Sequence, residues 1–326
     1  MQYPPSSKIW PNRRSGTLCG LLLFVQLSPG LFAQPTPQAE VPMHLGFSSA
    51  MFVGINMTDA RNSIKALTAS IAREVAIKAD PDPLIYENVD EAESLLRGHQ
   101  ITAVSMRTSE YWLLRRNIAF NRFLVTARKG NPTSAYLVLA REGSAITKLA
   151  DLRDKRVLVY TSPSMCLAIP WLDVELAKES LPTTSVFFGG LVDFPKPAKV
   201  VLPVFFGQAD ACLITRYAYD TIIELNPQVG RQLRIVATSP DYVATLFGFR
   251  ADLSPAFTEK AVRAFVALRY SVFGRQTLAI FQTEEIAEFS ADTFGPSLAL
   301  FDEHARLCPE ANAALIASLH GPRPLP

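Results

Sequence analysis

Short apolar runs alternate with amphipathic segments along most of this 326-residue chain. The runs are rich in Val, Ile, Leu and aromatic residues, which is typical of buried strands. The segments between them place apolar residues three or four positions apart, as on one face of a helix. The first such helix, which Thr58 or Asp59 is expected to cap, has its apolar face at Ile64, Leu67, Ile71 and Val75. This alternation predicts an α/β fold with parallel sheets.

A unit of helix, glycine and strand occurs twice. The first copy spans residues 92–105 around Gly98, and the second spans residues 198–214 around Gly207. A glycine suits the end of each helix because it tolerates a positive φ. Both strands are apolar enough for the buried centre of a parallel sheet. Finding the unit once in each half predicts two similar lobes.

The order of the elements predicts how the lobes are built from the chain. We expect a discontinuous first lobe at residues 43–130 plus 238–326, and a second lobe at 135–235. Long strands at 123–127 and 136–140 are candidates to cross between them. Each lobe is expected to be a mostly parallel sheet flanked by helices, with two crossings between the lobes. From about residue 254 the tail is expected to be mostly helical.

The first 33 residues predict a secretory signal peptide. Three basic residues and no acidic residue precede or flank a short apolar run at 18–27, and Ala33 is a small residue at the expected cut. The alternative is an uncleaved anchor, but the run is shorter than the ~20 residues that span a bilayer. Residues 34–42 are Pro-rich and read as a flexible leader. No second apolar stretch reaches spanning length, so we expect a soluble mature protein.

Composition and charge exclude several classes of protein. The chain is 48% hydrophobic and 19% charged, which suits a globular protein. Beyond residue 33 it carries 29 Lys and Arg against 30 Asp and Glu, with no basic block. We therefore expect neither nucleic-acid binding nor a polybasic membrane anchor.

The sequence indicates no catalytic, metal or cofactor site. It contains no nucleophile elbow, phosphate-binding loop, dinucleotide fingerprint or zinc-type pair of histidines. Cys166, Cys212 and Cys308 lie outside any metal or redox spacing, so we expect buried thiols with at most one disulfide. We expect no enzyme activity, no metal and no cofactor.

Short polar residues follow several predicted strands, two groups in each lobe. Ligands of parallel α/β sheets bind beyond the carboxyl ends of the strands, where hydroxyls and helix N-termini favour anions. Ordinary helix capping is the alternative for any single group. Four groups at equivalent positions favour a shared cleft. The groups are Ser48 and Ser49, the stretch 105–111, Thr161 with Ser162 and Ser164, and Thr215 with Arg216.

An ordered series of short stretches resembles one known family, the periplasmic solute-binding proteins of phosphate, phosphite and phosphonate transporters, within the type II periplasmic binding protein fold. The resemblance covers about residues 43–285. It is carried by Leu45–Ser49 with Asn56–Ala60, Leu149–Arg156, Gly207–Ala211, and Leu225–Gln228 through Leu233 to Ser239-Pro240.

The resemblance implies two lobes that close on a ligand by hinge motion, and an ABC permease and ATPase as partners. In the family a Ser/Thr-rich loop with Gly holds the anion, and residues 160–167 correspond to it here. Its hydroxyl donors carry over, but Met165 and Cys166 stand where the family has Ser and Gly, and Tyr160 stands where it often has Asp. These residues therefore favour a cleft that binds a solute without specifying a phosphonate. Tyr111 matches an aromatic residue that follows the inner strand of the first lobe.

The leading hypothesis is a periplasmic, monomeric substrate-binding protein that captures a small anionic solute, phosphonate-like, phosphate-like or related. Arg216 either pairs with the ligand or is solvated on its helix. The alternatives are a ligand-sensing protein that signals to a membrane receptor or kinase, and an enzyme with Cys166 as a thiol at a helix N-terminus. The predicted ligand-binding residues are Ser48, Ser49, Phe52, Ser105, Thr108, Tyr111, Thr161, Ser162, Ser164, Thr215 and Arg216.

Overall fold

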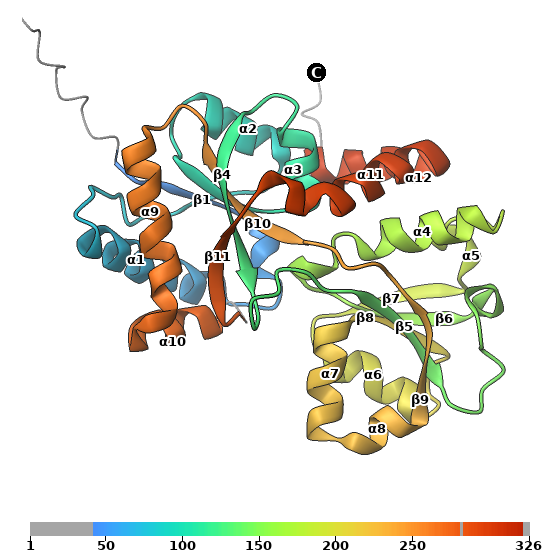
Figure 1. The fold of residues 1–326 in the computed structure, drawn as a ribbon. Coiled ribbons are helices and arrows are strands. Elements are labelled where there is room, and N and C mark those ends of the chain that lie inside the picture. The colour runs from blue at the N-terminus through green and yellow to red at the C-terminus, as the bar shows by residue number, and fades with distance from the viewer. Residues whose placement is uncertain (1–41, 281–282, 322–326) are drawn as a thin grey trace, which may run out of the picture. The chain divides into compact units, whose positions relative to one another are not determined.

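The computed structural model describes residues 42–280 and 283–321. The predicted signal peptide at 1–33, and all but the last residue of the predicted leader, lie outside the described residues. The described chain forms two β-sheets, each flanked by helices (Figure 1). This confirms the predicted α/β class, and we name the two parts the first lobe and the second lobe after their sheets.

The first lobe is built on a six-stranded sheet with strand order β11-β4-β10-β3-β1-β2. Its strands are β1 (Leu45–Ser48), β2 (Leu84–Tyr86), β3 (Ala103–Arg107), β4 (Phe120–Ala127), β10 (Thr245–Arg250) and β11 (Glu285–Phe289). Strand β1 pairs in parallel with β2 and β3, whereas β10 and β11 pair antiparallel with their neighbours. The expectation of a mostly parallel sheet is therefore corrected to a mixed sheet. Only β1, β2 and β3 are joined by helical crossovers, which is what parallel pairing requires.

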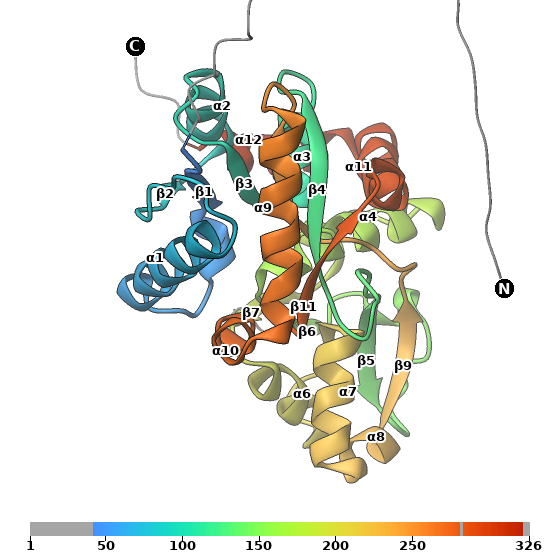
Figure 2. The same ribbon diagram turned by 60° about the vertical axis from the view of Figure 1, so that its left-hand side comes forward.

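Helices cover both faces of the first sheet. One face carries α1 (Met57–Glu74), α9 (Pro255–Ala267) and α10 (Val272–Ile280), as Figure 2 shows for α1 and α9. The other face carries α2 (Val89–Arg97), α3 (Thr108–Leu114), α11 (Gly295–Leu307) and α12 (Pro309–His320). Strand β4 shows the division, because Phe123 and Val125 join one hydrophobic cluster and Leu124 joins the other. Successive strand residues point to opposite faces, so both faces of this strand are buried.

The second lobe is built on a five-stranded sheet with strand order β7-β6-β8-β5-β9. Its strands are β5 (Tyr136–Arg141), β6 (Arg156–Tyr160), β7 (Gly190–Phe194), β8 (Ala211–Thr215) and β9 (Leu233–Thr238). Strands β6, β7 and β8 are parallel, and β5 and β9 complete a mixed sheet. Its helices are α4 (Ala168–Lys178), α5 (Thr184–Phe187), α6 (Pro197–Phe205), α7 (Arg216–Leu225) and α8 (Pro227–Gln232).

Two short connections join the lobes. The strands predicted to cross do not do so, since β4 ends within the first sheet at Ala127 and β5 begins within the second at Tyr136. The chain crosses at residues 128–135 and returns at 239–244. These connections run side by side, because Ser134 and Tyr242 exchange backbone hydrogen bonds of 3.0 and 3.1 Å.

Local chemistry at two helix ends differs from the expectation. Asn56, rather than Thr58 or Asp59, caps α1, and its Oδ1 accepts hydrogen bonds from the N–H groups of both. At the end of α2, Gly98 keeps a φ of −75°, and His99 takes the left-handed conformation at 55°. Helix α2 therefore ends at Gly98 as predicted, but the left-handed residue is His99, one position later. Gly207 does adopt a positive φ, of 71°.

The tail contains more than helices. Strand β11 pairs with β4 at the edge of the first sheet, and it was not part of the expectation for this region. Four of its five residues are partly exposed and the fifth, Glu288, is exposed, so the strand shows no alternation of buried and exposed positions. Helix α11 packs against α3 of the first lobe and also against α4 of the second lobe.

Candidate ligand-binding site

The carboxyl ends of the parallel strands of the two lobes lie close to each other. In the first lobe, the short 3-10 helix η1 (Ser49–Phe52) follows β1, and in the second lobe η3 (Pro163–Met165) follows β6. These two helices contact each other. A Cβ added to Gly54, just beyond η1, would lie 3.6 Å from Cβ of Pro195, just beyond β7. The loops in which the polar residues were predicted therefore face one another across the two lobes.

A buried ionic cluster closes the first-lobe side of this region. Glu110 is 1% exposed and accepts a hydrogen bond of 2.6 Å from Oγ of Ser48. Its carboxylate also accepts from the backbone N–H of Arg107 at 2.7 Å and from Nη2 of Arg107 at 3.1 Å. A Glu that reaches back to the residue before its helix is a capping arrangement, and it places Arg107 at the start of α3. Glu110 thereby neutralises the arginine that β3 delivers to the site.

Tyr86, at the end of β2, belongs to the same cluster. Burial, and then the negative charge of Glu110, raise the pKa of Tyr86 well above its usual value. Its hydroxyl donates a hydrogen bond to the backbone carbonyl of Ser105 at 3.4 Å. The phenol is therefore neutral at physiological pH and contributes hydrogen bonding without charge.

The loop after β6 docks onto the first lobe through the return connection. The backbone carbonyl of Ala244 accepts a hydrogen bond from Sγ of Cys166 at 3.2 Å and from the N–H of Thr108 at 2.8 Å. One carbonyl of the return connection thus holds the loop of one lobe and the helix N-terminus of the other. Burial raises the pKa of the Cys166 thiol to about 11, although Arg107 lowers it in part. The thiol is therefore protonated at neutral pH.

Several buried polar atoms at this meeting place have no protein partner within the described chain. They are Nε of Arg107, Oγ of Ser109 and Oγ1 of Thr161. A buried donor left unpaired costs about 1–3 kcal/mol. A ligand that supplied oxygen acceptors here would remove that cost.

The predicted hydroxyl groups of the second lobe lie together. Oγ of Ser162 and Oγ of Ser164 are 2.7 Å apart, in the same short loop as Thr161. Tyr136 in β5 helps to hold this loop in place, because its hydroxyl donates to the backbone carbonyl of Ser164 at 2.8 Å. On the first lobe, Oγ of Ser49 donates to the exposed carboxylate of Glu87 at 2.8 Å.

Other predicted residues are engaged in contacts of the fold itself. Phe52 is buried against Phe47. Tyr111 packs edge-on within an aromatic group formed with Phe120, Phe123 and Phe294. We therefore do not carry Phe52 or Tyr111 into the proposed site.

Two of the three threonines among the predicted residues, Thr108 and Thr215, form hydrogen bonds with the backbone. Oγ1 of Thr108 donates to the carbonyl of Val243 at 2.6 Å. Thr215 caps α7, with Oγ1 accepting from the N–H of Ala218 at 3.2 Å. Ser105 lies within β3, between Phe47 and Phe247 of the neighbouring strands. Arg216 begins α7, is partly exposed, and interacts electrostatically with Asp220.

Sequence reasoning missed three charged residues near the place where the lobes meet, Arg107, Glu110 and Arg128. The search was for short polar residues after strands, and long side chains were read as solvated. A signal was present for two of them, since Arg107 and Glu110 are spaced as a capping pair directly after a predicted strand. Arg128 follows β4, and its Cζ lies 3.0 Å from the ring centroid of Tyr217 in α7 of the second lobe. Nothing in the sequence indicates this contact.

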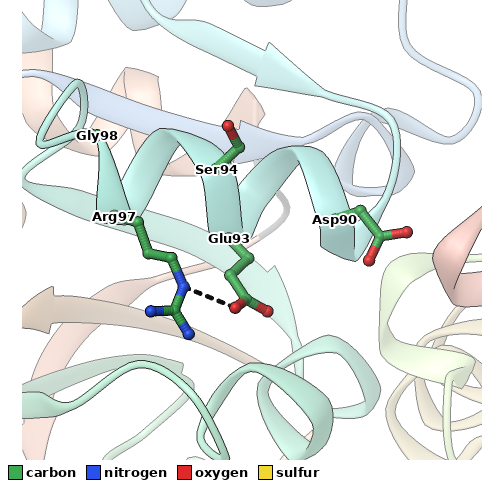
Figure 3. A pocket seen from close by; sticks show the side chains of 5 residues that line it. All are labelled: Asp90, Glu93, Ser94, Arg97 and Gly98. Atoms are coloured by element: carbon green, nitrogen blue, oxygen red, sulfur yellow. Dashed lines mark hydrogen bonds and ion pairs between the residues drawn. The ribbon is translucent and has the colours of Figure 1, made fainter.

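Two surface hollows lie elsewhere. One hollow, of about 610 Å³, is lined by α2 and the residue after it. Nε of Arg97 donates to Glu93 at 2.7 Å there, and Figure 3 shows the two side chains. A second, of about 320 Å³, lies between α1 and α10. Neither includes a residue predicted to bind ligand. The lining residues of the first hollow are Asp90, Glu93, Ser94, Arg97 and Gly98.

The described residues contain neither a metal-ligand cluster nor a disulfide. Within residues 42–280 and 283–321, no group of three or more His, Cys, Asp or Glu is arranged to hold a metal ion. Cys166, Cys212 and Cys308 are free thiols. None of the helices in the described segments combines the length and apolar character needed to cross a bilayer.

Two mixed sheets, with the polar ends of their parallel strands facing each other, define a two-lobed solute-binding protein. Residues 56–294 match the model of a family described as the periplasmic substrate-binding protein of phosphonate ABC transporters, and the chain belongs to this family. The match confirms the resemblance that the ordered stretches indicated.

Solved structures with the same fold support this assignment. XAC2383 from Xanthomonas citri, solved with ATP and with chloride ion, has a TM-score of 0.58 and 18% identity, covering 82% of this chain and 98% of that one. PhnD1 from Prochlorococcus marinus, in complex with methylphosphonate, has a TM-score of 0.54 and 15% identity, covering 82% and 98%.

A binding protein component of an ABC phosphonate transporter from Pseudomonas aeruginosa has a TM-score of 0.53 and 15% identity, covering 86% of this chain and 95% of that one. At these identities the likeness concerns the fold and not the ligand. No curated protein sequence matches the chain.

Proposed function

We propose that this protein captures a small anionic solute between its two lobes and delivers it to an ABC permease and its ATPase. The observation that carries the proposal is the set of buried, unpartnered polar atoms on Arg107, Ser109 and Thr161 where the lobes meet. All three lie at or just after the carboxyl ends of the parallel strands β3 and β6, which is where α/β sheets bind ligands.

The two lobes contribute different groups to the proposed site. The second lobe offers the hydroxyls of Thr161, Ser162 and Ser164 in one short loop. The first lobe offers Nε of Arg107 and the hydroxyl of Ser109 at the N-terminus of α3. A solute that bridges the two sets stabilises the closed arrangement, because its contacts with each lobe are complete only when the lobes are together.

The remaining parts of the proposal follow from the family. A periplasmic protein of this kind needs an export signal, which residues 1–33 are expected to provide, and it acts as a monomer on its permease. The family is one of binding proteins, and we assign no reaction to this chain.

A ligand screen tests the proposal directly. Purified mature protein is heated with methylphosphonate, phosphite, phosphate, methanesulfonate or acetate at millimolar concentration, and hits are measured by isothermal titration calorimetry. A ligand at 100 times its Kd adds about 2.7 kcal/mol to the unfolding free energy, which shifts the melting temperature measurably. Stabilisation by a neutral sugar alone, or by no solute, contradicts the proposal.

A threonine variant separates binding from folding. Thr161→Val removes a hydroxyl that has no partner in the fold, so ligand-free stability should not fall. Affinity for an anionic hit should fall about tenfold, because a hydrogen bond to a charged group contributes about 1.5–3 kcal/mol. Thr126→Val, at an exposed position of β4, is the matched control and should change neither quantity. Equal affinities for the two variants would remove Thr161 from the site.

A further inference from the structure

The C-terminal helices α11 and α12 are attached to the first lobe. Nε1 of Trp112 in α3 donates to Asp302 in α11 at 2.9 Å, and the Trp112 ring stacks on Phe301 with 5.3 Å between the ring centroids. At the other end of this segment, Nδ1 of His320 in α12 lies 2.8 Å from Oδ1 of Asp90 in α2. Because both ends are held, the two helices move with the first lobe.

Helix α11 also packs against α4 of the second lobe, through buried polar groups. Nε2 of His304 lies 3.1 Å from Oδ2 of Asp173, and both side chains are buried. The other carboxylate oxygen of Asp173 accepts the backbone N–H of Thr184 at 2.7 Å. Residues of the two helices belong to one hydrophobic cluster, in which Trp171 and Leu300 are buried. Separating α4 from α11 would break the buried pair and expose this apolar surface, so we expect the contact to persist when the lobes move.

The two chain connections meet beside this contact. Ser134 and Tyr242 exchange backbone hydrogen bonds of 3.0 and 3.1 Å. The centroid of the Tyr242 ring lies 6.1 Å from that of Tyr136 in β5, which in turn lies 6.3 Å from that of Trp171 in α4. Burial, and then carboxylates of α4 and α11, raise the pKa of Tyr242 to about 12. The connections and the contact between α4 and α11 therefore form one packed region.

Only part of each connection is left to bend. In the return connection, the N–H of Val243 donates to Oγ of the buried Ser297 in α11 at 2.9 Å. In the first connection, the N–H of Gly130 donates to Oε1 of Glu285 in β11 at 2.7 Å. Val243 and Gly130 are thus held by the first lobe. The segments left to bend are 131–135 and 239–242.

The loops of the cleft make a second contact between the lobes, at the far edge of the second sheet. The connections attach to β5 and β9, and β7 is the strand at the opposite edge. Just beyond β7, Cβ of Pro195 lies 3.6 Å from the position of a Cβ added to Gly54 of the first lobe. Rotation about an axis between the two contacts would compress one of them as the other opened. The contact between α4 and α11 is already packed, and packed side chains compress little. Opening beside β7 therefore needs an axis that runs through the contact between α4 and α11.

We propose that the contact between α4 and α11 is a fixed pivot. The second lobe swings about it by bending at 131–135 and 239–242, so that the cleft opens between Gly54 and Pro195 while α4 stays on α11. The C-terminal helices thus act as a strap beside the hinge. The strap permits opening and resists a twist of one lobe against the other, because any other rotation would separate α4 from α11. This rests on the proposed function only in taking the lobes to open for a solute.

Two cross-links test the pivot in the ligand-free mature protein. The pivot bridge joins Lys178→Cys in α4 to Glu303→Cys in α11 with a short bismaleimide reagent, since Nζ of Lys178 lies 3.6 Å from Oε1 of Glu303. The cleft bridge is a disulfide between Gly54→Cys and Pro195→Cys, whose Cβ separation of 3.6 Å lies within the ~3.5–4.5 Å typical of disulfides. Small-angle X-ray scattering compares each bridged protein with its own unbridged form. The cleft bridge should lower the radius of gyration, and the pivot bridge should leave it unchanged.

Each result decides the inference. A lower radius of gyration with the pivot bridge would mean that α4 leaves α11 on opening, and it overturns the pivot. Equal radii with and without the cleft bridge would mean that the lobes do not open, which overturns the pivot too. No solute is present in these measurements, so a negative ligand screen overturns the proposed function without deciding them.

A second cleft bridge keeps the test available if Gly54→Cys fails to fold. Gly54 has a left-handed φ of 77°, which disfavours a cysteine. The neighbouring residues Val53 and Lys196 both have exposed side chains. Val53→Cys and Lys196→Cys, joined by the same bismaleimide reagent, should lower the radius of gyration as the disulfide does.

Discussion

The Nε2 atom of His304 in α11 lies 3.1 Å from Oδ2 of Asp173 in α4. Both side chains are buried, and Oδ1 of Asp173 also accepts the backbone N–H of Thr184 at 2.7 Å. Helix α11 contacts the first lobe as well, where Nε1 of Trp112 donates to Asp302 at 2.9 Å. The C-terminal helices therefore join the second lobe to the first independently of the two chain connections.

Removing this buried pair should destabilise the protein strongly. Asp173→Ala leaves both His304 and the Thr184 N–H without their acceptor, and breaking a buried pair in this way costs about 3–5 kcal/mol. Asp90→Ala is the matched control, because Asp90 pairs with His320 at 2.8 Å on the surface. Exposed pairs contribute at most about 1 kcal/mol. Urea denaturation measures both, and similar losses would show that the buried pair has no special role.

Replacing Glu110 should lower stability far more than replacing Glu87. Both carboxylates accept a serine hydroxyl, but Glu110 is buried and also holds Arg107, whereas Glu87 is exposed. Glu110→Gln leaves Arg107 with a weakened partner in a buried setting, at a cost of about 2–4 kcal/mol. Glu87→Gln should cost less than about 0.5 kcal/mol. Thermal melting of the two ligand-free variants distinguishes these values, and a stable Glu110→Gln protein would show that the cluster is not structural.

The adjacent glycines at the start of β7, Gly189 and Gly190, should differ in how much stability their replacement by alanine costs. A Cβ on Gly189 would lie 2.3 Å from the backbone oxygen of Asp154, whereas a Cβ on Gly190 meets nothing within 4 Å. Backbone atoms yield little, so Gly189→Ala should cost about 1–3 kcal/mol or more. Gly190→Ala should be close to neutral. Chemical denaturation of the two variants provides the comparison, and equal midpoints would contradict the close approach.

The Cys166 thiol should be unreactive at neutral pH. Its pKa is raised to about 11 by burial, so its thiolate fraction at pH 7 is far below that of an ordinary cysteine. Iodoacetamide labelling, read by mass spectrometry of the Cys166 peptide, should be at least about tenfold slower in the native protein than in guanidinium-unfolded protein. Rapid native labelling would instead favour a reactive thiol at this position.

The same shift predicts a loss of stability in alkali. The folded protein retains the Cys166 proton up to about pH 11, whereas an unperturbed thiol loses it near its ordinary pKa of 9.0. The folded state therefore binds more protons in this window, and the unfolding free energy falls as pH rises through it. Burial raises the pKa of Tyr242 to about 12, which extends the effect upward. Cys166→Ala should flatten the lower part of the decline in urea midpoints measured between pH 8 and 11, and an unchanged slope would contradict the assignment.

The central strands were predictable because their side chains are buried on both faces. Strands were expected at 123–127 and 136–140, and the interior strands β4 and β5 cover these residues. Strand β11 was not predictable in this way, because it lies at a sheet edge and its residues are partly exposed. The second-lobe loop was located from its hydroxyl residues, since a strand followed by Ser and Thr before a helix is a local pattern.

The contacts and burial of single side chains in those loops were not predictable. Tyr111 and Arg107 belong to the same stretch after β3, yet one joins an aromatic cluster and the other lines the meeting place of the lobes. Phe294, which covers Tyr111, is nearly two hundred residues away in the chain. Burial of a side chain depends on such distant neighbours, and local sequence does not contain them.

By itself, the sequence determined the α/β class, the position of most strands and helices, and the family. These follow from hydrophobic periodicity and from short local stretches, which are properties of neighbouring residues. Only the tertiary structure decided that Glu110 neutralises Arg107, that Ala244 holds both lobes, and that Arg128 stacks on Tyr217. Each of these joins a charge or a donor to a partner brought near by folding, and the cost of burying an unpaired polar group makes such pairings decisive for the site.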